Sequence, residues 1–142
     1  NNTTGALMRL LEMAIEPFLI NASLTGILAQ RLARKLCLNC RHLVSPTEQE
    51  KAFITKLKLS ITALYTSAGC PECRYTGYKG RIGIFELLVV SEKLQALLTK
   101  RPIVSAIYQQ ALDDGLIPLM HDGAQKVTAG LINLAELVRT LC

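Results

Sequence analysis

Four of the five cysteines in this chain form two short pairs with the spacing of metal ligands. Two residues separate Cys37 from Cys40, and two separate Cys70 from Cys73. A two-residue gap lets both sulfurs of a pair face one point, so two such pairs can supply the four thiolates of a tetrahedral zinc site. Because a site of this kind has no open coordination position, the sequence predicts a structural metal that does no chemistry.

Other uses of these cysteines must be weighed against zinc. Two disulfides would require an oxidising compartment, and a redox pair is expected after a strand of a thioredoxin-like unit, which neither pair resembles. Unpaired core cysteines are a third alternative, but paired spacing is rare by accident. His42 is a conceivable substitute ligand, although a solvated loop histidine is the default when four thiolates are available. The sequence analysis therefore assigns the metal ligands to Cys37, Cys40, Cys70 and Cys73.

The span between the two pairs is longer than in a simple zinc ribbon. Residues 41–69 separate them, whereas ~15–20 residues are usual. The span must therefore contain structure of its own. The segment 45–48, Ser-Pro-Thr-Glu, is typical of a helix start, and we expect a short amphipathic helix over residues 48–59. Its inward-facing residues would be Phe53, Ile54 and Leu57.

Before the first pair, apolar periodicity predicts two helices. Thr3 or Thr4 can cap the first, and its buried face would consist of Leu7, Leu10, Leu11 and Ala14. Pro17 suits the first position of the second helix, whose apolar stripe would consist of Phe18, Ile20, Leu24 and Ile27. Residues 29–36 fit either a helix tail or a strand.

After the second pair, the apolar and β-branched run 82–90 predicts a well-buried strand. The remainder is expected to be helical. Ser91 caps a helix over residues 92–100, Pro102 opens another that stops at Gly115, and residues 122–128 form a third. Asn133, with Glu136 three residues later, matches an Asn version of the capping box before a last helix.

The composition points to a globular protein. The chain has 142 residues, of which 50% are hydrophobic, a formal net charge of +5 and a pI of about 9.1. The basic excess lies in and before the cysteine-containing segment. Lys35, Arg41 and Arg74 can be interpreted as counter-charges to a zinc tetrathiolate, which is formally −2. Without a dense Lys/Arg run or interleaved aromatic residues, we expect no nucleic-acid binding.

Catalytic motifs are missing from the chain. It has no Gly-x-x-x-x-Gly-Lys-Ser/Thr phosphate loop, no Gly-x-Ser-x-Gly elbow and no His-Glu-x-x-His zinc helix. His121 is a lone candidate base without a nucleophile, and an ordinary surface histidine is the simpler interpretation. We therefore predict no catalytic and no cofactor-binding residues in this chain.

Four ordered blocks resemble one known family. They are residues 4–20 (TGALMRLLEMAIEPFLI), 28–37 (LAQRLARKLC), 69–73 (GCPEC) and 76–88 (TGYKGRIGIFELL). The blocks closely resemble the ATPases of type II secretion and type IV pilus assembly, the general secretory pathway protein E family. The resemblance covers essentially the whole chain and is more specific than any single motif.

The resemblance implies a hexameric, RecA-like motor that binds ATP and Mg²⁺ and acts at the cytoplasmic face of the inner membrane, with platform proteins as partners. In that family the phosphate loop, the acidic boxes and a histidine box precede the part that matches here. The chain, which lacks an initiator methionine, therefore resembles a C-terminal fragment that is not catalytic alone. The alternative is a free-standing zinc-ribbon adaptor for nucleic acid or protein.

The same resemblance implies an α/β fold with three parts: the end of a RecA-like core (1–36), a tetracysteine zinc-binding insert (37–80), and a returning strand with a C-terminal helical subdomain or bundle (81–142). It favours a strand over about 29–35 that pairs with 81–88, with the insert as a protrusion that contacts a partner.

Individual positions carry further expectations from the resemblance. Arg31, Arg34 and Arg81 could face a nucleotide bound by a neighbouring subunit, although sheet-edge counter-charges are the simpler interpretation. Ala14 replaces a glycine common in the family, and we expect this change to favour helix by ~1 kcal/mol.

Overall fold

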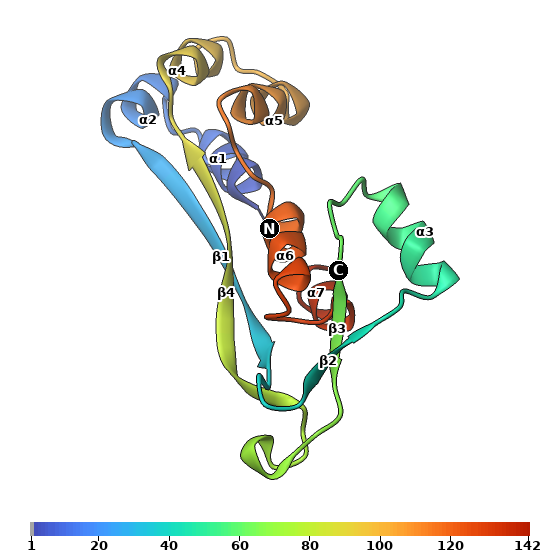
Figure 1. Cartoon of the computed structure of the whole chain (residues 1–142). Coiled ribbons are helices and arrows are strands. Elements are labelled where there is room, and N and C mark those ends of the chain that lie inside the picture. The colour runs from blue at the N-terminus through green and yellow to red at the C-terminus, as the bar shows by residue number, and fades with distance from the viewer. Residues whose placement is uncertain (1) are drawn as a thin grey trace. The chain divides into compact units, whose positions relative to one another are not determined.

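The computed structural model describes residues 2–142, which divide into two compact units. The first unit comprises residues 2–29 and 85–118, and the second comprises residues 30–84 and 119–142. Two long strands, β1 (Gly26–Leu36) and β4 (Tyr78–Val89), form a two-stranded sheet, and each strand continues from one unit into the other. Their arrows point in opposite directions (Figure 1). The predicted strand pairing is therefore confirmed, and the chain is a mixed α/β protein.

The first unit packs four helices around an apolar core. They are α1 (Thr3–Glu12), α2 (Pro17–Ser23), α4 (Glu92–Leu98) and α5 (Val104–Asp113). Helix α5 packs against both α1 and α4. Pro17 occupies the first turn of α2, and the Ser91 hydroxyl accepts a hydrogen bond from the Leu94 N–H at the start of α4, both as predicted. The core residues are Leu7, Ile20, Leu88, Val90, Leu94, Leu98, Ile107, Ala111 and Leu116.

The predicted cap of α1 is wrong by one residue. The Asn2 side chain accepts a hydrogen bond from the Gly5 N–H at 2.9 Å, so Thr3 and Thr4 lie inside the first turn. Thr3 is buried and donates from both its N–H and its hydroxyl to the buried carboxylate of Glu86, at 2.9 and 2.6 Å. A threonine that looks like a cap in the sequence therefore satisfies a buried acid on β4 instead.

The end of α1 also differs from the prediction. Ala14 lies beyond the helix with a φ of +59°, a left-handed conformation that glycine adopts more easily. The Ala14 N–H donates to the Leu11 carbonyl and the Ile15 N–H to the Leu10 carbonyl, which is the Schellman pattern of a helix end. Alanine in place of glycine at this position therefore costs free energy, whereas the helix-propensity argument expected a gain.

Two apolar segments are less buried than predicted. In β4, every second residue from Ile84 to Leu88 is buried, while Phe85, Leu87 and Val89 are exposed, so the strand covers the core with one face only. The predicted stripe of α2 also fails in part, because Phe18 is 72% exposed and Ile27 belongs to β1.

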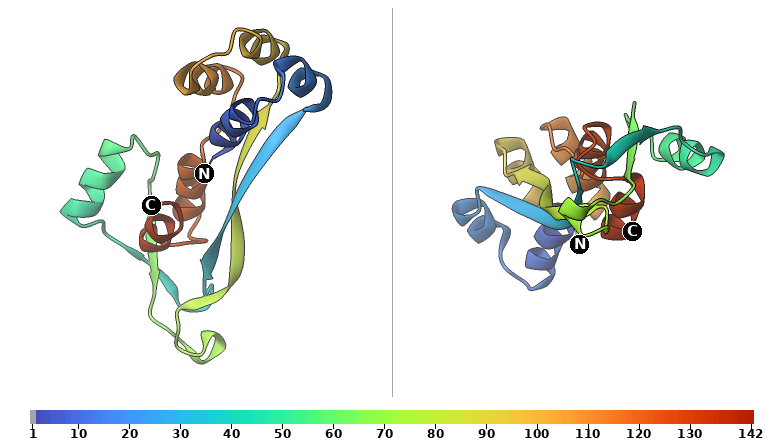
Figure 2. Two further views of the ribbon diagram at one scale, coloured as in Figure 1. Left: turned by 180° about the vertical axis from the view of Figure 1, so that it is seen from behind. Right: turned by 60° about the horizontal axis from the view of Figure 1, so that its bottom comes forward.

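The second unit contains a short antiparallel ribbon and three helices. The ribbon pairs β2 (Arg41–Val44) with β3 (Leu64–Ser67), and the helices are α3 (Glu48–Lys56), α6 (Leu119–Thr128) and α7 (Leu134–Leu141). A short 3₁₀ turn, η1 (Pro71–Cys73), lies between β3 and β4. Helices α6 and α7 pack against each other, as both views of Figure 2 show. The Gly123 position allows this approach, because a Cβ there would clash with Leu137 Cδ1.

Helix α3 confirms the predicted structure between the cysteine pairs. Thr47 and Glu50 form a complete capping box, with the Glu50 N–H donating to the Thr47 hydroxyl and the Thr47 N–H to the Glu50 carboxylate. None of the helix residues is buried, so the expected inward face is only partly covered. None of the helices in residues 2–142 has the length and hydrophobicity that a membrane span requires.

Candidate metal centre

The β2–β3 ribbon brings the two cysteine pairs together. Cys37 follows β1 and Cys40 precedes β2, while Cys70 directly precedes the single turn η1 and Cys73 is its last residue. Because Arg41 pairs with Ser67, the start of β2 lies beside the end of β3. The Ala68 N–H continues this pairing with a hydrogen bond to the Cys40 carbonyl. Residues distant in sequence thereby converge at one end of the ribbon.

The four sulfurs form a compact cluster whose size fits a metal ion. The Sγ atoms of Cys37 and Cys70 are 3.8 Å apart, those of Cys70 and Cys73 are 3.8 Å apart, and those of Cys40 and Cys73 are 3.9 Å apart. All four lie within 4.8 Å of one another. A zinc–sulfur bond of about 2.3 Å gives a tetrahedral S···S edge of about 3.8 Å. The cluster is therefore compatible with zinc.

The alternatives for these cysteines fit the geometry less well. A disulfide would bring two sulfurs to about 2.05 Å, whereas all five cysteines are free. His42 is exposed on β2 and is not part of the cluster, and Cys142 is exposed at the end of the chain. Within residues 2–142 the four cysteines are the one group of His, Cys, Asp and Glu side chains close enough to hold a metal.

N–H donors point at the sulfurs and favour thiolates. The N–H groups of Cys70 and Gly77 lie 3.2 and 3.3 Å from Cys73 Sγ, and the Asn39 amide lies 3.3 Å from Cys70 Sγ. Burial raises the pKa of Cys73, but these two backbone N–H groups, together with hydrogen bonds to the Cys70 and Cys40 side chains, outweigh burial and lower the pKa to about 6. The Asn39 amide similarly lowers the pKa of Cys70. Burial raises the pKa of Cys40 to about 11, so a metal must displace a proton there.

Gly69 allows the second pair to close into its turn. Its φ is +90°, and a Cβ at this position would lie 2.9 Å from the Tyr75 carbonyl oxygen. The Tyr75 N–H in turn donates to the Cys70 carbonyl at 2.9 Å. Only glycine provides both the backbone conformation and the space for this close approach.

Arg41 fastens the cluster to α6 and does not serve simply as a counter-charge. Its guanidinium donates to the carbonyls of Ala129 and Gly130, at 3.2 and 2.6 Å, and lies over the ring of Tyr65. Carbonyls at a helix C-terminus carry partial negative charge and are otherwise unpaired. The sequence suggested a role near the metal for this arginine but could not identify the helix end as its partner.

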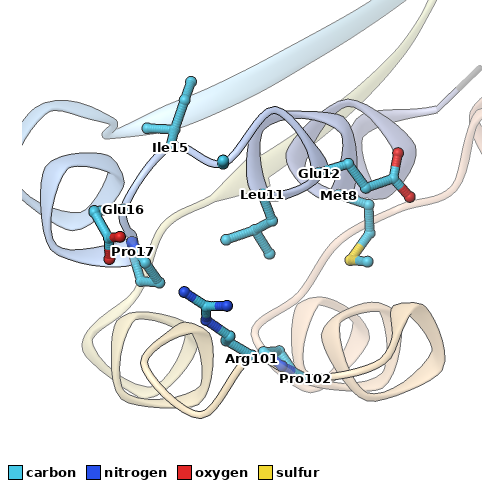
Figure 3. Close-up of a pocket in the computed structure, with 9 residues that line it drawn as sticks. Met8, Leu11, Glu12, Ile15, Glu16, Pro17, Arg101 and Pro102 are labelled. Atoms are coloured by element: carbon cyan, nitrogen blue, oxygen red, sulfur yellow. The ribbon is translucent and has the colours of Figure 1, made fainter.

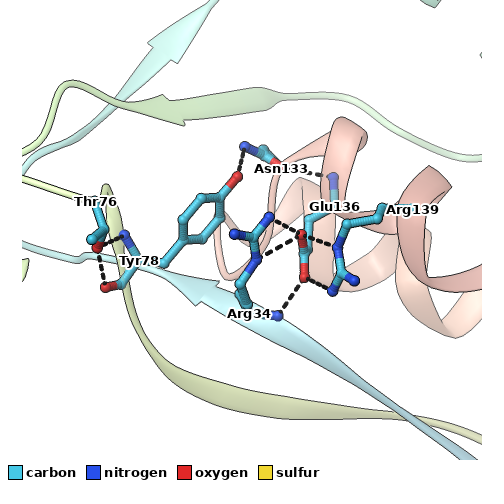
Figure 4. A network of polar contacts seen from close by, with 6 residues as sticks. All are labelled: Arg34, Thr76, Tyr78, Asn133, Glu136 and Arg139. Carbon is cyan, nitrogen blue, oxygen red and sulfur yellow. Dashed lines mark hydrogen bonds and ion pairs between the residues drawn. The ribbon is translucent and has the colours of Figure 1, made fainter.

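Arg34, three residues before Cys37 in the sequence, belongs to a polar network (Figure 4). Its guanidinium donates to the Glu136 carboxylate at 2.8 and 3.1 Å, and its backbone N–H donates to the same carboxylate at 2.8 Å. The Arg139 guanidinium also donates to the Glu136 carboxylate. The Arg34 guanidinium stacks on Tyr78, with its Cζ atom 4.2 Å from the ring centroid. The Tyr78 hydroxyl accepts a hydrogen bond from Asn133. These contacts favour the counter-charge interpretation of Arg34 over contact with a nucleotide.

Glu136 was missed as a member of this site. The Asn133 side chain accepts a hydrogen bond from the Glu136 N–H, as predicted for a cap, but the Glu136 side chain turns to the two arginines and completes no capping box. It is 1% exposed, and hydrogen bonds from Arg139 and then Arg34 lower its pKa to about 2. No local pattern could reveal a partner about a hundred residues away.

A separate pocket of about 420 Å³ lies in the first unit. It is formed by the end of α1, the start of α2 and the segment after α4, and its wall is mostly apolar. Figure 3 shows the Arg101 side chain extending across it toward Pro17 and Leu11, with Glu12 and Glu16 at the margin. The pocket holds no nucleophile or metal-ligating cluster, so the cysteines remain the candidate site.

The chain is similar to known secretion proteins. The family model "Type II/IV secretion system protein" matches residues 1–139. Type II secretion system ATPase E of Vibrio cholerae is 42% identical over 98% of this chain and 27% of its own length. Type II secretion system protein E of Pectobacterium carotovorum is 40% identical over 98% of the chain and 27% of its own length.

A pilus protein is similar as well. Type IV pilus assembly ATPase TfpB of Acinetobacter baylyi is 35% identical over 99% of this chain and 24% of its own length. The chain thus spans about a quarter of the length of the curated relatives it matches, 24% to 27% of those compared above.

Proposed function

The chain belongs to the Type II/IV secretion system protein family, and we propose that it is the C-terminal, zinc-binding region of a hexameric ATPase that powers type II secretion or type IV pilus assembly. The division into the end of a RecA-like core (1–36), a zinc-binding insert (37–80) and a returning strand with a helical subdomain (81–142) is part of this proposal. Family membership supports it over a free-standing zinc-ribbon adaptor.

The S···S separations of 3.8 to 3.9 Å carry the zinc proposal. Cys37, Cys40, Cys70 and Cys73 occupy all four positions of a tetrahedral ion and leave none for substrate. The ion therefore supplies rigidity: it ties the chain after β1 to the chain before β4. Structural zinc contributes on the order of 10–16 kcal/mol of apparent binding free energy to small domains, enough to hold a ribbon with little core of its own.

ATP hydrolysis in this proposal depends on the part of the protein that carries a phosphate loop. The chain has no Gly-x-x-x-x-Gly-Lys-Ser/Thr sequence, so its residues bind neither the triphosphate nor Mg²⁺ in that manner. Its roles are structural support, contacts between subunits, and docking on platform proteins at the cytoplasmic face of the inner membrane. Its own residues hold the metal, and the Arg34–Glu136–Arg139 network fixes α7 to the strand that leads into the cluster.

The proposal is tested on the full-length protein with two cysteine variants. Native mass spectrometry should find one zinc per chain in the wild type, with four cysteines protected from alkylation. Cys37→Ser removes one ligand and should lose the zinc and most of the ATPase activity. Cys142→Ser is the matched control, because it removes the one exposed cysteine outside the cluster and should keep both zinc and activity.

Different failures contradict different parts of the proposal. Four cysteines that react freely in the wild type would refute the zinc site. Absence of ATP hydrolysis by the full-length wild type would refute the motor. A salt-sensitive shift of nonspecific DNA by the zinc-loaded protein would favour the adaptor instead.

A further inference from the structure

A groove of about 350 Å³ runs beside the cysteine cluster. Lys35 and Lys79 line it together with the apolar side chain of Leu38, which is 55% exposed. Leu36, Cys37, Asn39 and Glu72 complete the wall. Glu72 forms an ion pair with Lys79 at 2.8 Å. The groove thus combines an apolar contact with two cations and a single carboxylate.

The turn after Cys73 is a second exposed feature, and it directly follows a cysteine of the cluster. Arg74 and Tyr75 are exposed, Tyr75 by 74%, and both have left-handed backbone conformations, with φ of +53° and +61°. Two consecutive non-glycine residues in this conformation are costly, and such strain gathers at functional sites. Hydrogen bonds from the Arg74 N–H to Pro71 and from the Tyr75 N–H to Cys70 hold the turn. A tyrosine and an arginine on a rigid turn lose little entropy on binding.

The exposed side chains of this surface carry a net positive charge in the described residues, and the zinc tetrathiolate proposed above, formally −2, lies behind them. None of the ion pairs among residues 2–142 includes Lys35 or Arg74, and Glu72 is the one carboxylate that faces the lysines in the groove. Three of the four cysteines of the cluster are buried, although Cys37 forms part of the groove wall. An approaching molecule therefore meets the cations and the apolar side chains first.

We propose that these residues, Lys35, Leu38, Arg74, Tyr75 and Lys79, form a docking surface for an acidic segment of a partner protein that also carries apolar side chains. This inference rests on the proposed function and adds the partner's chemistry to it. Charge complementarity selects the acidic segment, while Leu38 and Tyr75 give it apolar contacts that a purely electrostatic encounter lacks.

A photo-crosslinking experiment in cells tests the surface on the full-length protein. The photoreactive amino acid p-benzoylphenylalanine replaces Tyr75, and mass spectrometry identifies the crosslinked residues. The expected adduct lies in an Asp- and Glu-rich segment of another protein. Adding Arg74→Glu should lower the crosslink yield by roughly fivefold or more, since one attractive contact becomes repulsive.

Lys58→Glu is the matched control. Lys58 is an exposed cation in the same unit and has a similar backbone conformation, with φ of +52°, but it follows α3 and lies outside the docking surface. It should leave the yield unchanged. Zinc content, measured on each variant, shows whether the cluster still forms.

The outcomes separate the two proposals. Adducts to lipid, to a second copy of this chain or to a segment without net negative charge would overturn the docking surface, as would no adduct or equal losses from Arg74→Glu and Lys58→Glu. In each of these cases, a protein that still binds zinc and hydrolyses ATP leaves the proposed function intact. A wild type without zinc refutes the zinc proposal itself, whatever the crosslinks show.

Discussion

Replacing Ala14 with glycine should stabilise the end of α1, although alanine is the better helix former. Ala14 has a φ of +59° immediately after the helix. An L-residue with a Cβ pays roughly 1–2 kcal/mol in this conformation, and glycine does not. Glycine in turn gains about 0.4–1 kcal/mol of entropy in the unfolded chain. The net expectation for Ala14→Gly is a gain of about 0.5–1 kcal/mol.

Ala6→Gly is the matched control, because it makes the same chemical change at an exposed position within α1. There the backbone is helical, and glycine should cost about 0.5–1 kcal/mol. Hydrogen exchange followed by mass spectrometry on the full-length protein measures the local effect without assuming two-state unfolding. Exchange over residues 3–13 should slow by about two- to fivefold in Ala14→Gly and quicken by a similar factor in Ala6→Gly.

Both variants replace alanine with glycine, so the sign of the change in exchange rate shows whether residue 14 is helical. If Ala14→Gly speeds exchange as Ala6→Gly does, residue 14 is helical and the Schellman ending of α1 is refuted. If neither changes exchange, the end of α1 opens too readily for the conformation of residue 14 to matter.

Two further predictions concern the second unit. Glu136→Gln should lower stability by about 2 kcal/mol, which is less than for a fully enclosed ion pair because both arginines are half-exposed. The pKa of Glu136 is lowered from 4.5 to about 2 in the folded protein. The difference in urea unfolding between variant and wild type should therefore persist above pH 4.5 and vanish as the pH falls through 2. A difference that is unchanged at pH 2 would contradict the carboxylate's role. Gly69→Ala should make zinc easier to remove with a chelator than Gly80→Ala does, because both glycines have positive φ but a Cβ clashes only at Gly69. Equal zinc loss from the two variants would show that the close approach to Tyr75 is not limiting.

Features within one short segment were predictable from the sequence. The Cys-x-x-Cys spacing acts over three residues, and the Thr47 cap and the Pro17 start of α2 depend on backbone groups within one turn. The long span between the cysteine pairs required internal structure, and α3 and the β2–β3 ribbon supply it. The ambiguous segment 29–36 needed the family resemblance, because its own pattern fits a strand and a helix equally well.

Predictions that depended on distant neighbours were less reliable. The apolar run of β4 indicated a strand buried on both faces. An apolar side chain does not specify which element covers it, and in the structure of residues 2–142 the side chains of Phe85, Leu87 and Val89 are exposed to solvent. Thr3 looked like a cap, but it hydrogen-bonds Glu86 on β4. Ala14 looked helical because propensity describes a helix interior and carries no information about where the helix ends.

The sequence alone therefore predicted a donor set for the candidate metal centre, a mixed α/β fold and the family, because ligand chemistry and family-specific blocks are carried by residue type and order. Only the tertiary structure brought Cys37 and Cys70 to 3.8 Å, joined Arg34 to Glu136 and exposed Tyr75 beside the cluster. These relations join segments far apart in the chain or depend on what covers a side chain. The physical reason is that burial, ion pairing and metal geometry depend on distances in space, which the chain acquires only when its strands and helices pack.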